Sequence, residues 1–192
     1  MTGIIILAAG ASTRMGEAKQ NLHFKGQTLL QTAVKTAVTS KANTVAVVLG
    51  ANANSIAPTI ISEPVRVFVN DDWHTGMGAT ISYGLKELLK LRPDLSSVVF
   101  TLTDQPLVDN HFINKLIDQA APGKIVASSY NETLGPPVLF DKQFFEEILL
   151  MTGNDGAKRI IQKHQKAVVE IPFSLGAFDI DTPDDYHRLS KL

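Results

Sequence analysis

Cations and carboxylates stand where short apolar runs of this sequence end. Arg14 and Lys19 follow the first run, and side chains of this kind neutralise phosphate oxygens. Asp104 follows the run 97–102, and a carboxylate at the tip of a buried strand is costly unless it is paired or bound to a cation. Mg²⁺ takes one or two carboxylates together with phosphate oxygens and waters, which fits Asp104. The alternative is an aspartate that caps the next helix or satisfies the turn at Pro106.

A second acidic group lies near the C-terminus. In a strand, Asp179 and Asp181 would face the same side, and two like charges so close repel unless a cation lies near them. The alternative makes Asp181 or Thr182 the N-cap of a final helix that starts with a proline. For Asp184 and Asp185 we favour the second interpretation, because acids in a first helical turn are stabilised by the helix dipole.

The loop between the first apolar run and Lys19 permits close approach of a ligand. Residues 8–12 read Ala-Ala-Gly-Ala-Ser, so the backbone can come near a flat or anionic group and its free N–H groups can wrap a phosphate. The loop is not a Walker A loop, because Gly16 is not followed by Lys-Ser or Lys-Thr, and it lacks the Gly-x-Gly-x-x-Gly order. Taken alone, its glycines are equally compatible with an ordinary turn.

A second glycine-containing segment follows a strand and opens a helix. It contains Gly76, Met77, Gly78 and Thr80, and a helix N-terminus favours anions. The alternative is an ordinary turn at a helix start. The neighbouring His74 is interpreted as structural, since the five histidines show no metal-binding spacing, and Trp73 as core or pocket wall.

Alternating strands and helices must position these residues. Continuous apolar runs predict strands at 4–8, 44–49, 65–69, 97–102, 124–129, 137–140 and 167–171, with a short last strand at 178–180. Helical spacing predicts helices at 27–40, 52–61 (weakened by Pro58), 79–91, 110–121, 142–151 and 156–164, with a final helix from Pro183. The pattern predicts an α/β, single-domain, three-layer Rossmann-like fold over 1–192, with a mostly parallel sheet. Ligands of such sheets bind beyond the carboxyl ends of the strands.

Composition excludes several classes of protein. Of 192 residues, 44% are apolar, and 18 Lys and Arg against 19 Asp and Glu leave a net charge of −1, so a nucleic-acid partner is not expected. With no cysteine, disulfides, thiolate zinc sites and cysteine nucleophiles are excluded. The apolar runs are too short to span a bilayer and no basic segment precedes the first one, so we expect a cytoplasmic protein without a membrane partner.

The order of these segments resembles the MobA-like nucleotidyltransferases, most closely the molybdenum cofactor cytidylyltransferase branch. The resemblance rests on Leu7-Ala8-Ala9-Gly10-x-Ser12-x-Arg14-Met15-Gly16-x-x-Lys19, Asp104-Gln105-Pro106, Gly135-Pro136-Pro137-Val138-Leu139-Phe140 and Asp181-Thr182-Pro183. Gln105 stands where the family often has methionine. Such enzymes join a nucleoside monophosphate from a nucleoside triphosphate onto a phosphorylated acceptor and release pyrophosphate.

The resemblance also implies roles for individual residues. The base and ribose would meet the backbone of residues 8–10, and Arg14 and Lys19 would hold the triphosphate. Asp104 and Asp181 would hold Mg²⁺, with Asp179 as the alternative second ligand. The nucleotide-binding residues would be Leu7, Ala8, Ala9, Gly10, Ser12, Arg14, Lys19, Gly76, Met77, Gly78, Thr80 and Thr103. The segment Gly135, Pro136 and Pro137 would border the acceptor, stiffened by its prolines.

One further segment departs from the family pattern. Residues 153–159 resemble a Gly-Asp-x-Gly-Ala-Arg run, but Asn154 stands where aspartate is usual. Lys158 and Arg159 could meet an acceptor phosphate or form a solvated helix face, and we favour the solvated face.

The implied reaction transfers CMP from CTP to the phosphate of molybdopterin, with GTP as the alternative donor. A molybdenum enzyme would be a further partner. A sugar-1-phosphate nucleotidyltransferase shares the loop and the fold and stays an alternative. A different class of alternative is a nucleotide-binding maturation factor of a molybdenum enzyme that releases no pyrophosphate. The charged residues Arg14, Lys19, Asp104 and Asp181 argue against this last interpretation, since they serve catalysis.

Overall fold

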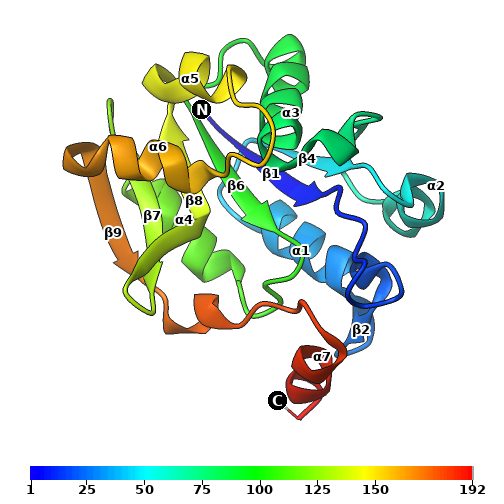
Figure 1. The fold of residues 1–192 in the computed structure, drawn as a ribbon. Helices are drawn as coiled ribbons and strands as arrows, with labels where there is room; N and C mark the ends of the chain where they lie inside the picture. Colours follow the sequence, from blue (N-terminus) through cyan, green and yellow to red (C-terminus); the bar gives the residue numbers. More distant parts are fainter. Residues whose placement is uncertain (192) are drawn as a thin grey trace.

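The central strand β1 (Thr2–Ala8) is buried along its whole length, because helices cover both faces of the sheet that contains it (Figure 1). The computed structural model describes residues 1–191. Seven strands follow the order β5-β4-β1-β6-β8-β7-β9. Their bounds are β4 Thr44–Leu49, β5 Arg66–Val69, β6 Ser97–Leu102, β7 Ile125–Tyr130, β8 Thr133–Asp141 and β9 Val168–Pro172. Only β8 runs antiparallel to its neighbours, so the prediction of a mostly parallel sheet is confirmed.

Two hydrophobic clusters follow from the alternation of side chains along β1. Ile5 and Leu7 pack in one cluster with α3 (Met77–Leu91), α5 (Phe145–Leu149) and α6 (Ala157–Lys163). Ile4 and Ile6 point to the opposite face. There they pack with α1 (Leu29–Val38), α2 (Ala53–Ile56) and α4 (Asn110–Asp118). A continuous apolar strand of this kind is what a sheet covered on both faces requires.

The ends of three parallel strands meet at one edge of the sheet. The register pairs Ala8 of β1 with Leu49 of β4, and Leu7 with Leu102 of β6. The loops that follow these strands therefore leave the sheet side by side. This edge is where the sequence predicts a ligand.

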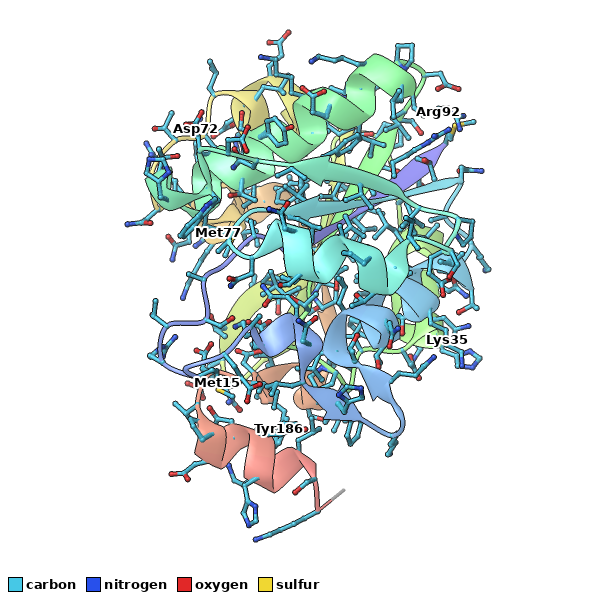
Figure 2. All side chains as sticks on the ribbon, turned by 90° about the vertical axis from the view of Figure 1, so that its right-hand side faces the viewer. Met15, Lys35, Asp72, Met77, Arg92 and Tyr186 are labelled. Atoms are coloured by element: carbon cyan, nitrogen blue, oxygen red, sulfur yellow. The ribbon has the colours of Figure 1, made fainter. Side chains whose placement is uncertain are left out.

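A small satellite unit flanks the loop after β1. It contains the hairpin β2 (His23–Phe24) and β3 (Gln27–Thr28), and the last helix α7 (Pro183–Leu189). Tyr186 of α7 packs in one hydrophobic cluster with Met15, and Figure 2 shows the two side chains at the junction of helix and loop. The Tyr186 hydroxyl donates a hydrogen bond to the His23 carbonyl at 2.8 Å. The C-terminal helix is thereby fastened to the N-terminal loop.

Three predicted elements differ from the structure. The helix predicted at 52–61 is a single turn of α2 followed by a 3₁₀ turn at Ala57–Ile60, because Pro58 cannot donate a helical hydrogen bond. The helix predicted at 142–151 is likewise a 3₁₀ turn, Lys142–Phe144, followed by the short α5. The prediction of a strand at 178–180 is wrong, since this segment pairs with no strand in the sheet. Over residues 1–191, no helix has both the length and the apolar character needed to cross a membrane.

Gly84 sets how closely α3 approaches the sheet. A Cβ atom at this position would lie 2.7 Å from Val48 Cγ2 and 3.2 Å from Ile5 Cγ2, and both neighbours are fully buried. We expect Gly84→Ala to lower the free energy of unfolding by about 1 kcal/mol, because overpacking outweighs the gain in helix propensity. Urea denaturation measures the change, with the exposed Lys86→Ala on the same helix as control. An unchanged or raised stability of Gly84→Ala would contradict the packing argument.

Candidate active site

A buried glutamine shapes the loop after β1. Gln20 is 1% exposed, and its Nε2 donates to the carbonyl oxygens of Ala8 at 2.9 Å and Gly10 at 3.0 Å. Ser12 adds a second tie, because its hydroxyl accepts from the Lys19 backbone N–H at 3.1 Å. The loop therefore folds back on itself and returns Lys19 to the end of the sheet. Sequence reasoning did not identify the role of Gln20.

A pocket of about 310 Å³ lies at the carboxyl edge of the sheet. One wall is the stretch from Leu7 to Ala11, and the opposite wall comes from the start of α3 and the turn before it. The lining residues are Leu7, Ala8, Ala9, Gly10, Ala11, Lys19, Gln20, Trp73, His74, Gly76, Met77, Thr80, Leu102, Thr103, Asp104 and Asn154. Ten of the residues that the sequence predicts for a nucleotide or metal site thus meet at one pocket: Leu7, Ala8, Ala9, Gly10, Lys19, Gly76, Met77, Thr80, Thr103 and Asp104.

Other predicted residues lie beside the pocket and not in its lining. Ser12 holds the loop, and Arg14 extends from the loop into solvent with 68% of its side chain exposed. Gly78 is buried at the first turn of α3. The exposed Lys158 and Arg159 lie on α6, where Arg159 pairs with Asp155, as a solvated helix face does.

The two glycines before and inside α3 make room for another part of the chain. Gly76 has φ +121°, and a Cβ atom there would lie 2.3 Å from the Gly153 carbonyl oxygen. A Cβ at Gly78 would lie 2.6 Å from the Thr152 carbonyl oxygen, and the Gly78 N–H donates to the Gly153 carbonyl at 2.8 Å. The loop at 152–156 therefore packs directly on the helix start, and this contact brings Asn154 to the pocket wall. The turn at Gly76 and the loop at 152–156, which the sequence analysis considered separately, therefore form one wall of the pocket.

Lys19 joins the two carboxylates that the resemblance assigns to a metal. Its Nζ donates to Asp104 Oδ2 at 2.5 Å and to Asp181 Oδ1 at 3.2 Å. Arg14 donates to the other Asp181 oxygen at 2.9 Å. Burial lowers the pKa of Lys19, but the two carboxylates more than offset this effect and the pKa is raised above its ordinary value. Lys19 is therefore an ammonium ion at neutral pH.

Two hydrogen bonds bring the C-terminal segment to the end of β6. The Ile180 N–H donates to the Asp104 carbonyl at 2.9 Å, and Gln105 Nε2 donates to the Gly176 carbonyl at 3.1 Å. Gln105 is only 4% exposed, so it is an anchor of this segment. Gln105 therefore has a structural role, because it holds the C-terminal segment at the end of β6.

The acids near the C-terminus have different surroundings. Partial desolvation and the nearby Asp104 raise the pKa of Asp179 to about 6, although the residue as a whole is exposed. Asp181 instead makes the ion pairs with Lys19 and Arg14. Thr182 and Asp185 form a capping box that starts α7, so the expected N-cap is confirmed. Hydrogen bonds from Thr182 and Arg188 lower the pKa of Asp185 to about 2.

The carboxylate pair fits a hard divalent cation. Asp104 Oδ1 is buried and has no hydrogen-bond partner among residues 1–191, so it is an acceptor that lacks a donor or a cation. The described residues contain no group of three or more His, Asp or Glu side chains suited to a metal. A cation at Asp104 and Asp181 would need its remaining ligands from water and from a substrate, which is typical of Mg²⁺ sites that serve phosphates.

The predicted acceptor segment lies on the other side of β6. Gly135, Pro136 and Pro137 belong to the first half of β8, which pairs antiparallel with β6 through Phe100 and Val138. They therefore extend toward the carboxyl end of β6, on the side away from β1. Gly135 is small because the Tyr130 hydroxyl would lie 2.6 Å from a Cβ atom there. Asp104 stands between the pocket and this segment.

The model of the MobA-like NTP transferase domain matches residues 4–168. The chain belongs to this family. It is 31% identical to the purine catabolism protein PucB of Bacillus subtilis over 97% of this chain and 95% of that protein. It is also 28% identical to the nicotine blue oxidoreductase of Paenarthrobacter nicotinovorans, over 98% and 96% of the two chains.

Solved structures of members of this fold agree with the architecture. The crystal structure of Rv0371c from Mycobacterium tuberculosis is 26% identical, with a TM-score of 0.88 over 100% of this chain and 97% of that chain. A complex of Rv0371c with manganese is 25% identical, with a TM-score of 0.82 over 99% and 97%. A nucleotidyl transferase from Methanothermobacter thermautotroptrophicus shares the fold at 19% identity, with a TM-score of 0.85 over 100% and 96%.

Six residues of the pocket lining were not among the predicted site residues: Ala11, Gln20, Trp73, His74, Leu102 and Asn154. His74 was interpreted as structural and Trp73 as core or pocket wall, and both line the pocket from a 3₁₀ turn before α3. Their position just before Gly76 was the signal available. Asn154 was noted only as a departure from a family pattern, because nothing in the sequence shows that its loop packs on α3.

The ties made by Gln20 can be tested through stability. We expect Gln20→Leu to lower the free energy of unfolding by about 2–4 kcal/mol, because two carbonyl oxygens lose their donor. Chemical denaturation measures the loss. Gln162→Leu, on the exposed side of α6, is the matched control and should stay within about 0.5 kcal/mol of the parent. A loss as small as in this control would show that Gln20 does not hold the loop.

Proposed function

We propose that this protein transfers CMP from CTP to the phosphate of molybdopterin and releases pyrophosphate. The observation that carries the proposal is the cluster of Lys19, Asp104 and Asp181, in which Lys19 and Asp104 line a pocket of about 310 Å³. The pocket has room for a base and a ribose, and the cluster combines a phosphate-binding cation with carboxylates for a divalent ion. The product cofactor would pass to a molybdenum enzyme.

The chain's own residues would catalyse the reaction by positioning and charge. The acceptor phosphate is already an anion, so in-line attack on the α-phosphorus needs no strong general base. Asp104 and Asp181 would hold Mg²⁺, which supplies charge neutralisation at the phosphate oxygens when bound. Arg14 and Lys19 would stabilise the leaving pyrophosphate. The backbone of residues 8–10 would contact the base and ribose.

The arrangement of the sheet supports separate sides for donor and acceptor. The pocket lies over the end of β1, whereas Gly135, Pro136 and Pro137 lie toward β8, with Asp104 at the end of β6 between them. An acceptor phosphate approaching from the β8 side would face the α-phosphorus across Asp104. In-line transfer needs such opposite approaches of nucleophile and leaving group.

The alternatives differ in donor, acceptor or class of reaction. The preference for CTP over GTP rests on the resemblance of the loop 7–19. A sugar-1-phosphate acceptor stays an alternative, as does a binding protein that releases no pyrophosphate. A full-length relative named nicotine blue oxidoreductase adds a redox reaction to the candidates.

A pyrophosphate-release assay tests the proposal. The protein is incubated with each of the four nucleoside triphosphates, with molybdopterin and with Mg²⁺ or Mn²⁺. We expect pyrophosphate only when triphosphate, molybdopterin and metal are all present, and fastest with CTP. If GTP were the one triphosphate that supports release, GTP would replace CTP as the proposed donor. If a sugar phosphate supported release in place of molybdopterin, it would replace the proposed acceptor. Absence of pyrophosphate under every one of these conditions would refute the proposed reaction itself.

Asp104 is the most informative position for substitution. We expect Asp104→Asn to lower kcat by about 100-fold or more, because an amide keeps the shape of the side chain but loses the charge that holds the cation. Pyrophosphate release measures the effect, and circular dichroism checks the fold. Asp118→Asn, which removes an exposed carboxylate paired with Lys41, should leave turnover unchanged. Turnover of Asp104→Asn near that of the parent would contradict the assignment.

A further inference from the structure

Lys19 occupies the place between Asp104 and Asp181 where a shared cation would lie. Its Nζ reaches one oxygen of each carboxylate, at 2.5 Å and 3.2 Å, and also donates to the Ile180 carbonyl at 3.4 Å. The Lys19 and Asp104 side chains are each only 16% exposed. One ammonium charge thus compensates two neighbouring carboxylates, with help from the exposed Arg14 at the far oxygen of Asp181.

An ammonium ion and a divalent cation compete for the same carboxylate oxygens, because their positive charges repel each other at such short range. Asp104 Oδ1 has no hydrogen-bond partner among residues 1–191, so half of this carboxylate is open to a cation while the other half is held by Lys19. Two partly buried carboxylates without any cation would repel each other strongly. Lys19 therefore balances the charge of the two carboxylates before a metal binds. Its ammonium group must give up at least part of these contacts when a metal binds.

The backbone of Lys19 is held in place, and its long side chain is tied at the ammonium group. The Lys19 N–H is held by the Ser12 hydroxyl, and the residue begins a 3₁₀ turn that ends at Asn21. The four-carbon stem of a lysine allows the ammonium group to swing about this fixed point. Lys19 also lines the pocket, so the phosphates of a bound nucleotide lie within the volume that it can reach.

We propose that Lys19 is a displaceable counter-ion that bridges Asp104 and Asp181 until a divalent cation takes its place, and that it then turns to the nucleotide's phosphates. This inference rests on the proposed function, because it assumes a metal at the two carboxylates and a triphosphate in the pocket. Its consequence is a coupling of the two ligands. Metal alone must break the ion pairs of Lys19, whereas metal with nucleotide offers the ammonium group new anionic partners. The same coupling must then strengthen nucleotide binding when metal is present.

Binding of Mn²⁺ alone tests the displacement. Free Mn²⁺ is measured by electron paramagnetic resonance with the parent protein, Lys19→Met and Arg14→Gln. We expect Lys19→Met to bind Mn²⁺ about tenfold more tightly than the parent, because no ammonium competes for the carboxylates. Arg14→Gln removes the same unit of charge from the same cluster, but from an exposed group, and should change the affinity less than about threefold. Equal or weaker binding by Lys19→Met would overturn the proposal, as would an equal gain in both variants.

A second pair of measurements tests the coupling between metal and nucleotide binding, and the stability of the variant. The nucleotide is a non-reactive analogue of CTP with a methylene between its α- and β-phosphorus atoms. Its addition should raise the Mn²⁺ affinity of the parent clearly more than that of Lys19→Met. Because unpaired carboxylates destabilise the fold, Mn²⁺ should also raise the melting temperature of Lys19→Met more than that of the parent. If Lys19→Met does not fold, Lys19→Gln replaces it in both measurements. Equal coupling in parent and variant would overturn the proposal.

The Asp104→Asn variant separates failure of this inference from failure of the proposed function. If it binds Mn²⁺ as well as the parent does, the metal site itself is wrong and the proposed reaction loses its basis. If it loses Mn²⁺ while Lys19→Met gains nothing, the metal site stands and only the displacement by Lys19 is refuted.

Discussion

The shared cation between Asp104 and Asp181 is the constraint on which the rest of the site depends. The two carboxylates lie far apart in the sequence, yet both contact one ammonium group at 2.5 Å and 3.2 Å. Two carboxylates so close together are stable only with a positive charge between them. The loop after β1 supplies this charge, because Gln20 and Ser12 fold it back and return Lys19 to the sheet edge. The ion pairs of Lys19 therefore join the loop after β1, the end of β6 and the C-terminal segment into one cluster of charges.

The C-terminal segment belongs to this cluster of charges, although the family model of the MobA-like domain ends before the segment begins. The model matches residues 4–168, whereas Asp181 comes later in the chain. Ile180 and Gln105 fasten the segment to the end of β6, and the capping box of Thr182 and Asp185 starts α7 directly after Asp181. The aspartate is thus fixed from both sides. The sequence analysis weighed a capping motif and a candidate metal ligand as competing interpretations of this segment. The two occupy neighbouring residues, and the cap helps to hold the aspartate in place.

The sequence predicted what depends on local patterns and missed what depends on contacts between distant segments. Continuous apolar runs predicted the strands, and the charged residues at their ends predicted a cluster that the structure brings together. The residues 178–180 looked like a strand because apolar side chains alternate there, but the segment is tied to the end of β6 by one hydrogen bond, from the Ile180 N–H to the Asp104 carbonyl, and not by a neighbouring strand. The wall formed by Gly76 and Asn154 was equally invisible, since the contact joins residues far apart in sequence.

The position of β6 separates the pocket from the segment that we propose borders the acceptor. The pocket and the phosphate-binding loop depend on β1 and its parallel neighbours, while the segment at Gly135 depends on the reversed strand β8. Asp104 and Lys19 line the pocket, and Asp104 follows β6, the strand that lies between β1 and β8. In the proposed reaction, substitutions on the β8 side, such as those around Tyr130, would therefore change which acceptor binds without moving the cation cluster.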